Sequence, residues 1–250
     1  MSLPNPPISG YPTPRPSVIR FEAIGDAWHF FAAEWQTWVV STLIGLLVMA
    51  GIPTAAAIGM ILPPALTHRE PSPELMFGMF LVIALCALLL GPWIMAGWYK
   101  MAANQIRGIP ISIADTFSHG ELIPKMLGVC ILYWFSMMVG FLGCCIGAYV
   151  VGGLLMLAMP LAVDQPLGVL ECLSQSFEKL KKDWLMATLF YLVVSMLGGM
   201  GAYVCYVGLL VTYPLMFLSI AILYRDVFLT PPPGETQQGN IEQPPVHPIE

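Results

Sequence analysis

The chain has 250 residues, of which 57% are hydrophobic and only 10% are charged, and its formal net charge is −5. Soluble domains carry about 25% charged residues, so this composition excludes an ordinary soluble domain covered by charged side chains. Uncharged apolar runs of about 18 residues or more are typical of membrane-spanning helices, and the chain contains several of them. We therefore expect an all-α polytopic membrane protein whose partners include membrane lipids and not nucleic acid.

Both ends of the chain are rich in proline and polar residues. Residues 1–17 and 229–250 are expected to be disordered cytoplasmic tails, because proline favours an extended, unpacked chain. The N-terminal stretch lacks the charged, apolar and small-residue regions of a signal peptide. Either tail could present polyproline-type segments to protein partners, although solvated tails are the simpler interpretation. The residues between them, 18–228, form the predicted membrane domain.

Four apolar runs follow one another in this domain: Trp38–Leu62, Met76–Trp98, Met126–Val163 and Trp184–Tyr224. One helix over the third run, which has 38 residues, would be about 57 Å long. The hydrocarbon core of a bilayer is only about 30 Å thick. We therefore predict that this run folds back as two spans at the glycine-rich residues 140–147, because glycine accepts backbone angles that other residues resist. The same reasoning divides the fourth run near residues 198–201 and predicts six transmembrane helices.

The positions of the basic residues support six spans. Nine of the ten Lys and Arg residues fall before span one, between spans two and three, between spans four and five, or after span six: Arg15, Arg20, Lys100, Arg107, Lys125, Lys179, Lys181, Lys182 and Arg225. Only Arg69 falls on the other side. Basic residues are concentrated in cytoplasmic loops, so both termini are expected in the cytoplasm and the protein in the cell membrane, typically a bacterial inner membrane.

A threefold internal repeat divides the domain at about 18–108, 109–165 and 166–228. Each copy is predicted to begin with an amphipathic helix in the membrane interface and to continue as a transmembrane helical hairpin. The apolar positions of the first and third copies have the same +4, +3, +4, +3 spacing, which places them on one helical face. The expected aromatic anchors of these faces are Trp28, Trp35, Trp38, Phe117, Phe177 and Trp184. The alternative is a helix packed on the protein itself.

The second copy has a weaker pattern, because Gly120 and Pro124 interrupt its apolar stripe. Ser112 and Asp115 have the spacing of a capping pair that opens a short helix. Each second span also carries a proline late in the helix, at Pro92, Pro160 or Pro214. Proline removes a backbone hydrogen bond and kinks a helix. These positions are expected to be structural kinks or, alternatively, to surround a cavity.

Three stretches carry a resemblance to a known family: "MPLAVDQPLGVLECLSQSFEKLKKDWL", "YPLMFLSIAILYRDVF" and "AANQIRGIPISIADTF". They combine a proline near a span end, an acidic residue before a proline, an amphipathic helix with a tryptophan, and a terminal Tyr-Arg-Asp. This pattern resembles the YciC-like, DUF975 and DUF4013 membrane proteins of unknown function and the membrane domain of some glycerophosphoryl diester phosphodiesterases. The resemblance covers about residues 20–228 and implies a helical membrane domain, with no catalytic residues to carry over.

The spans themselves contain no ionisable residue, whereas proton or ion pathways usually need one. We expect no catalytic site, no cofactor and no metal site. The candidates for contact with lipid headgroups are Lys179, Lys181, Lys182 and Arg225. These features predict a membrane scaffold or accessory subunit that binds lipid or protein partners. The alternatives are a transporter or channel for an apolar or amphipathic solute and, third, a lipid-modifying enzyme that uses Asp26, His29, Asp115 and His119.

Overall fold

The computed structural model describes residues 19–66, 70, 72–143, 145–203 and 207–229. The two predicted tails lie outside this part of the chain, apart from Leu229. Every regular element within it is helical. Six segments are long and apolar enough to cross a membrane: Trp35–Leu62, Pro73–Ile106, Ile113–Gly143, Ile146–Asp164, Val169–Tyr203 and Leu209–Leu229. The prediction of a polytopic all-α membrane protein with six spans is confirmed.

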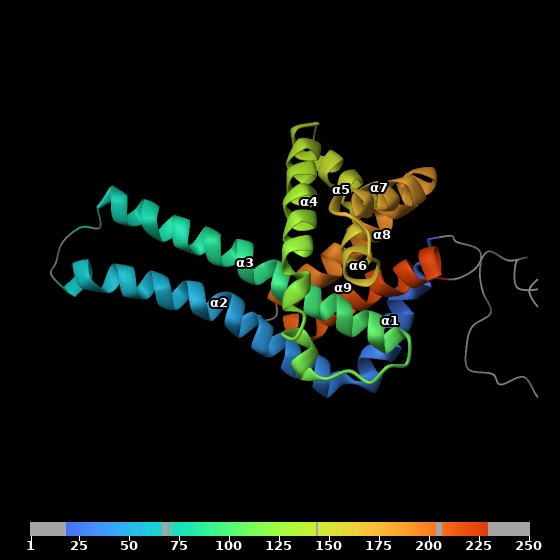
Figure 1. Ribbon diagram of the computed structural model, residues 1–250, viewed down its shortest axis with the longest axis horizontal. Helices are drawn as coiled ribbons and strands as arrows, with labels where there is room; N and C mark the ends of the chain where they lie inside the picture. The colour runs from blue at the N-terminus through green and yellow to red at the C-terminus, as the bar shows by residue number, and fades with distance from the viewer. Residues whose placement is uncertain (1–18, 67–69, 71, 144, 204–206, 230–250) are drawn as a thin grey trace, which may run out of the picture.

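The first copy consists of α1 (Glu22–Ala33), α2 (Trp35–Leu66) and α3 (Pro73–Ile106). With 32 and 34 residues, α2 and α3 are about 48 and 51 Å long. They run side by side and form an arm that extends away from the rest of the molecule (Figure 1). The side chains on the outer part of the arm are largely exposed and apolar. In a membrane protein such a surface is covered by lipid.

The second copy differs from the prediction of an amphipathic helix. Two short 3-10 turns, η1 (Ile113–Thr116) and η2 (Gly120–Leu122), stand in its place. The interruptions at Gly120 and Pro124 account for this difference, because neither residue sustains a helix. The hairpin that follows is α4 (Ile123–Gly143) and α5 (Cys145–Leu155), continued by α6 (Ala158–Asp164).

The fold-back between α4 and α5 lies in the predicted glycine-rich stretch. A Cβ atom at Gly140 would lie 2.8 Å from the carbonyl oxygen of Gly147, and one at Gly147 would lie 2.3 Å from that of Gly140. Any larger residue would therefore push the two helices apart. Glycine is needed here for close backbone approach as well as for the turn.

The third copy follows the predicted plan. An amphipathic helix, α7 (Val169–Leu180), leads through a 3-10 turn, η3 (Lys181–Asp183), into α8 (Trp184–Met200). After the turn η4 (Gly201–Tyr203), α9 (Leu209–Tyr224) ends in a π-helical turn, η5 (Arg225–Leu229). Helix α9 lies at the centre of the core, where it packs against α1, α2, α3 and α8.

The three hairpins do not form a symmetrical bundle. The arm of α2 and α3 runs across the view in Figure 1, whereas α4 stands upright and crosses its direction. The inner part of the arm packs against α4 and α9, and its outer part has no such neighbours. The repeat predicted from the sequence therefore has no counterpart in how the three hairpins are arranged in space.

Candidate lipid and ligand sites

The three prolines that were predicted to kink their helices lie in the core. Pro92 and Pro214 lie inside α3 and α9, Pro160 lies in α6, and all three are buried. Neither of the two hollows described below is lined by any of them. Their positions agree with structural kinks whose surroundings are packed.

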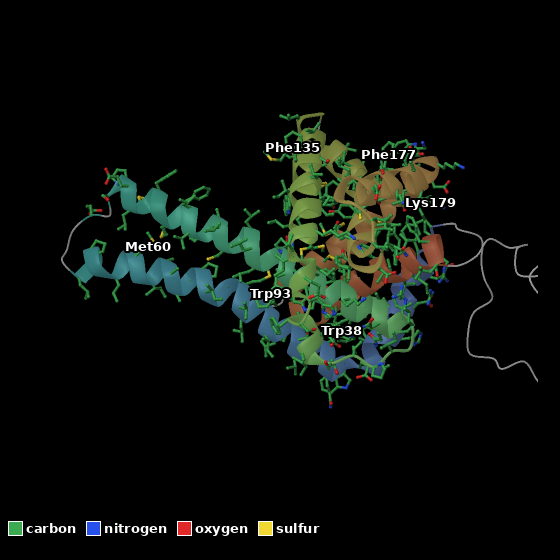
Figure 2. The ribbon with its side chains drawn as sticks, viewed as in Figure 1. Trp38, Met60, Trp93, Phe135, Phe177 and Lys179 are labelled. Carbon is green, nitrogen blue, oxygen red and sulfur yellow. The ribbon has the colours of Figure 1, made fainter. Side chains whose placement is uncertain are left out.

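Four of the six expected aromatic anchors are on the surface. Trp28, Trp35, Phe177 and Trp184 are each about half-exposed, which suits contact with the membrane interface. Phe117 is only half-buried against the protein, with its ring centroid 5.5 Å from that of Trp93 at the base of the arm (Figure 2).

Trp38 corrects the prediction, because its side chain is fully buried and does not reach the surface. Its indole N–H donates a hydrogen bond to the Gln105 side-chain oxygen at 2.7 Å, and Gln105 donates to the Phe30 carbonyl at 2.6 Å. This chain of bonds ties the start of α2 to the end of α3. The +4, +3 spacing places Trp38 on a face with Trp35 but does not show which neighbour covers that face.

The predicted amphipathic helix α1 packs partly on the protein. Ala23, Ala27 and Phe31 are buried in the contact between α1 and α9, while Trp28 faces outward. The side chains that α1 buries are thus mainly small ones, which let the two helices approach closely. The alternative of a helix packed on the protein is therefore correct for these three buried residues, while Trp28 is exposed.

The expected headgroup-binding residues have internal contacts as well as exposed surface. The Lys179 ammonium lies 5.7 Å from the centre of the Phe228 ring, and Lys181 forms an ion pair with Glu178. Lys182 is exposed. The Arg225 guanidinium donates to Asp226 at 2.9 and 3.0 Å. Arg225 is therefore engaged within the protein.

The ends of α3, α6 and α9 meet in a polar cluster that the sequence analysis did not identify. The Asp164 side chain is only 3% exposed. One of its oxygens accepts hydrogen bonds from Arg107 at 2.5 Å and from the Tyr224 hydroxyl at 2.7 Å. Gln165 donates to the Tyr224 hydroxyl, and Lys125 donates to the Gln165 carbonyl. The second spans of the three hairpins therefore end on the same side of the molecule.

A second ionic cluster joins the N-terminal segment to the end of α9. The Arg20 guanidinium donates to Asp226 at 2.6 Å and to Asp26 at 3.1 Å. Burial alone lowers the pKa of Arg20, but its bonds to the two carboxylates outweigh burial and raise that pKa. The hydrogen bond to Asp164 likewise raises the pKa of Arg107. Both guanidiniums stay charged at any physiological pH, and the two clusters hold the helix ends together.

Three of the four residues considered for catalysis are engaged in local structure, whereas His29 is exposed on α1. Asp115 accepts a hydrogen bond from the Ser112 backbone N–H at 2.8 Å, which is the predicted capping contact. A ring nitrogen of His119 lies 3.0 Å from the Asp115 carbonyl oxygen, and Asp26 binds Arg20. No group of three or more His, Cys, Asp or Glu side chains suited to a metal ion occurs within the described residues.

Two hollows are the candidate binding sites. The larger is a groove of about 530 Å³ between α4, α5 and α7, which we call the α7 groove. Phe135 of α4 and Phe177 of α7 belong to its walls (Figure 2). The smaller, of about 150 Å³, lies between α3, α4, α6, α8 and α9. Tyr99, Tyr133 and Tyr191 line it, so we call it the tyrosine cavity.

The packing of these hollows could not be derived from the sequence. The groove forms only when α7 packs against α4 and α5. In this contact Val169 lies close to Gly128, and the Ser176 hydroxyl donates to the Leu154 carbonyl at 2.8 Å.

Comparison of the chain with models of known protein families, with curated proteins and with solved structures found no match.

Proposed function

We propose that this protein is a non-catalytic membrane scaffold that holds a lipid molecule in the α7 groove. The observation that carries the proposal is the composition of the groove wall. Three helices supply apolar side chains to it: Phe135, Val139, Val151, Leu154, Leu155, Leu170, Leu173 and Phe177. An acyl chain is the apolar molecule that a membrane supplies in abundance, and burying it contributes about 0.8 kcal/mol per methylene.

The edge of the groove offers polar groups that suit a lipid headgroup. The Ser174 hydroxyl in its lining can hydrogen-bond to such a headgroup, whereas the Glu178 carboxylate, also in the lining, pairs with Lys181. Three exposed lysines, Lys179, Lys181 and Lys182, lie at the end of α7. Basic side chains next to an amphipathic helix attract anionic lipid. We therefore infer an acyl chain in the groove and an anionic phosphate headgroup beside the lysines.

Native mass spectrometry of the purified protein tests this proposal. Val139→Trp places a large side chain in the groove, and Val193→Trp makes the same change at an exposed valine of α8 outside it. We expect Val139→Trp to lower the affinity for phosphatidylglycerol about tenfold, as the loss of two methylene contacts would. Equal lipid binding by the two variants would contradict the proposal.

The headgroup part of the proposal has a separate test. Replacing Lys181 and Lys182 together by Gln removes positive charge but leaves the groove intact. The preference for phosphatidylglycerol over phosphatidylethanolamine of the same acyl chains should fall, while the binding of phosphatidylethanolamine stays the same. An unchanged preference would mean that these lysines serve only membrane topology.

One observation favours the alternative of a transporter or channel for an apolar or amphipathic solute. The tyrosine cavity lies where the three hairpins meet, which is where a substrate pathway would run. The burial of Pro92, Pro160 and Pro214 gives this alternative less support than the groove gives the first. Release of an amphipathic dye from proteoliposomes at the rate of protein-free liposomes would end it.

The orientation and the family relationship belong to the same proposal. The positive-inside pattern supports a cytoplasmic location of both termini. We propose a bacterial inner membrane as the location, with the tails available to protein partners in the cytoplasm. Reporter fusions after residues 110 and 182 should both show a cytoplasmic location. A relationship to the YciC-like membrane proteins rests on the three stretches quoted above and on the six-span arrangement.

A further inference from the structure

The tyrosine cavity is lined by a tyrosine whose hydroxyl has no hydrogen-bond partner among the described residues. Tyr99 is only 3% exposed and lines the cavity from α3. Its ring lies edge-on against Phe217, with 4.8 Å between ring centroids. Within the part of the chain that the structure describes, no group accepts from or donates to its hydroxyl. Tyr99 lines the cavity, so its hydroxyl is available to hydrogen-bond with a molecule that binds there.

The tyrosine hydroxyl hydrogens in the cavity outnumber the acceptors that the described residues offer them. Tyr99, Tyr133 and Tyr191 bring three hydroxyl hydrogens to it. One hydrogen is used in the bond of 2.9 Å between the Tyr133 and Tyr191 hydroxyls. The nearby Ser195 hydroxyl donates instead to the Leu192 carbonyl at 2.9 Å. Two tyrosine hydrogens are therefore left without an acceptor among the described residues, whichever way the Tyr133–Tyr191 bond is directed.

The remaining lining is apolar and suits a flat ring. Four methionines belong to it: Met95, Met156, Met159 and Met216. Thioether sulfur makes favourable contacts with aromatic rings, and methionine adapts to the shape of a ligand. A volume of about 150 Å³ is that of a cavity known to hold benzene.

The lining of the cavity extends to the surface of the protein. Trp134 of α4 belongs to its lining and is 67% exposed. A molecule dissolved in the bilayer can therefore approach the cavity beside Trp134 without passing through water.

We infer that the tyrosine cavity binds a lipid-soluble ring compound that carries a carbonyl group, as aryl ketones and quinones do. A carbonyl oxygen has two lone pairs and no hydrogen, so it can accept from both unused tyrosine hydroxyls. The ring lies among the methionine side chains, and any longer substituent leaves beside Trp134. The cavity is separate from the α7 groove, so this inference does not depend on lipid binding there.

The first test compares two probes that differ in one atom. 4-Fluoroacetophenone carries the carbonyl oxygen, whereas 4-fluoro-α-methylstyrene has the same shape with a CH₂ group in its place. Fluorine NMR of each probe with the full-length protein in lipid nanodiscs, against empty nanodiscs, measures saturable binding. We expect the ketone to bind at least fivefold more tightly, the difference expected for one hydrogen bond or more. Equal affinities, or no saturable binding of either probe, would overturn the inference.

The second test separates ligand binding from a structural role of the hydroxyl. Tyr99→Phe should weaken binding of the ketone about fivefold and leave the melting temperature of the ligand-free protein unchanged or higher. Tyr213→Phe removes a hydroxyl from α9 outside the cavity and should change neither quantity. A clear fall in the melting temperature with Tyr99→Phe alone would show that bound water satisfies the hydroxyl and would overturn the inference. Should Tyr99→Phe fail to fold, that outcome also counts against it, and the comparison of probes on the unmodified chain still decides.

Discussion

Gly97 of α3 lies against the backbone of Thr116 in the turn η1. A Cβ atom at Gly97 would lie 2.1 Å from the Thr116 carbonyl oxygen, which is closer than any side chain tolerates. Thr116 itself is fully buried, and its hydroxyl lies 2.6 Å from that of Ser41 in α2. The Ser41 hydroxyl also accepts from the Trp98 indole N–H at 3.2 Å. The turn η1 thus fits between the two helices of the arm where they enter the core.

The first prediction concerns this contact. Gly97→Ala should destabilise the protein by about 1–3 kcal/mol, because the added methyl group must displace backbone atoms. Thermal unfolding in detergent measures the effect. Gly91→Ala is the matched control in the same helix, since its nearest neighbour would be the end of the Met49 side chain at 3.9 Å. Equal melting temperatures of the two variants would show that η1 does not sit against α3.

The second prediction concerns the cluster at the converging helix ends. Asp164→Asn keeps the shape of the side chain but removes the charge that pairs with Arg107, and we expect a loss of about 2 kcal/mol. Part of the Arg107 side chain is exposed and can turn to water, which limits the loss. Denaturant unfolding in mixed micelles gives the free energy. Asp183→Asn, at an exposed position in η3, should be neutral, and a loss of similar size there would refute a special role of Asp164.

The third prediction distinguishes the two tryptophans of α2 that share a predicted face. Trp38→Phe removes the indole N–H and leaves the Gln105 oxygen without its donor, so stability should fall by about 1–3 kcal/mol. Trp35→Phe should change stability little, because Trp35 is 52% exposed. The melting temperatures of the two variants provide the comparison. A larger effect at Trp35 would mean that Trp35, and not Trp38, is the tryptophan of α2 that packs in the core.

The fourth prediction concerns the environment of the arm. Ile58 of α2 and Phe80 of α3 are both well exposed. Each is two residues from one member of the contact between Met60, which Figure 2 labels on the arm, and Gly78. In a chain without its native cysteines, spin labels at these positions should be accessible to oxygen and shielded from a water-soluble nickel complex. A label at Ser72, in the connection between α2 and α3, should show the reverse. Equal access of the nickel complex to all three positions would place the outer arm in water.

Much of the fold can be predicted from the sequence with two lengths, the rise of a helix per residue and the thickness of a bilayer. The rise of a helix and the thickness of a bilayer require the run Met126–Val163 to fold back, and in the structure α4 ends at Gly143 and α5 begins at Cys145. The composition alone predicts that the chain lies in a membrane, because it has too few charged residues to cover a water-facing surface. The amphipathic helix α7 is likewise found where the spacing of its apolar residues predicts it.

The tertiary structure decided which of these faces are covered and by what. Periodicity places Trp35 and Trp38 on one face, but only the position of α3 makes one exposed and the other buried. The polar groups Arg107, Asp164 and Tyr224 are far apart in the sequence, and no local pattern indicates that one carboxylate oxygen accepts from both of the other two. The tyrosine cavity has the same origin, since α3, α4 and α8 each contribute one tyrosine. Local spacing determines what each helix can present, whereas the contacts between helices depend on how distant segments pack.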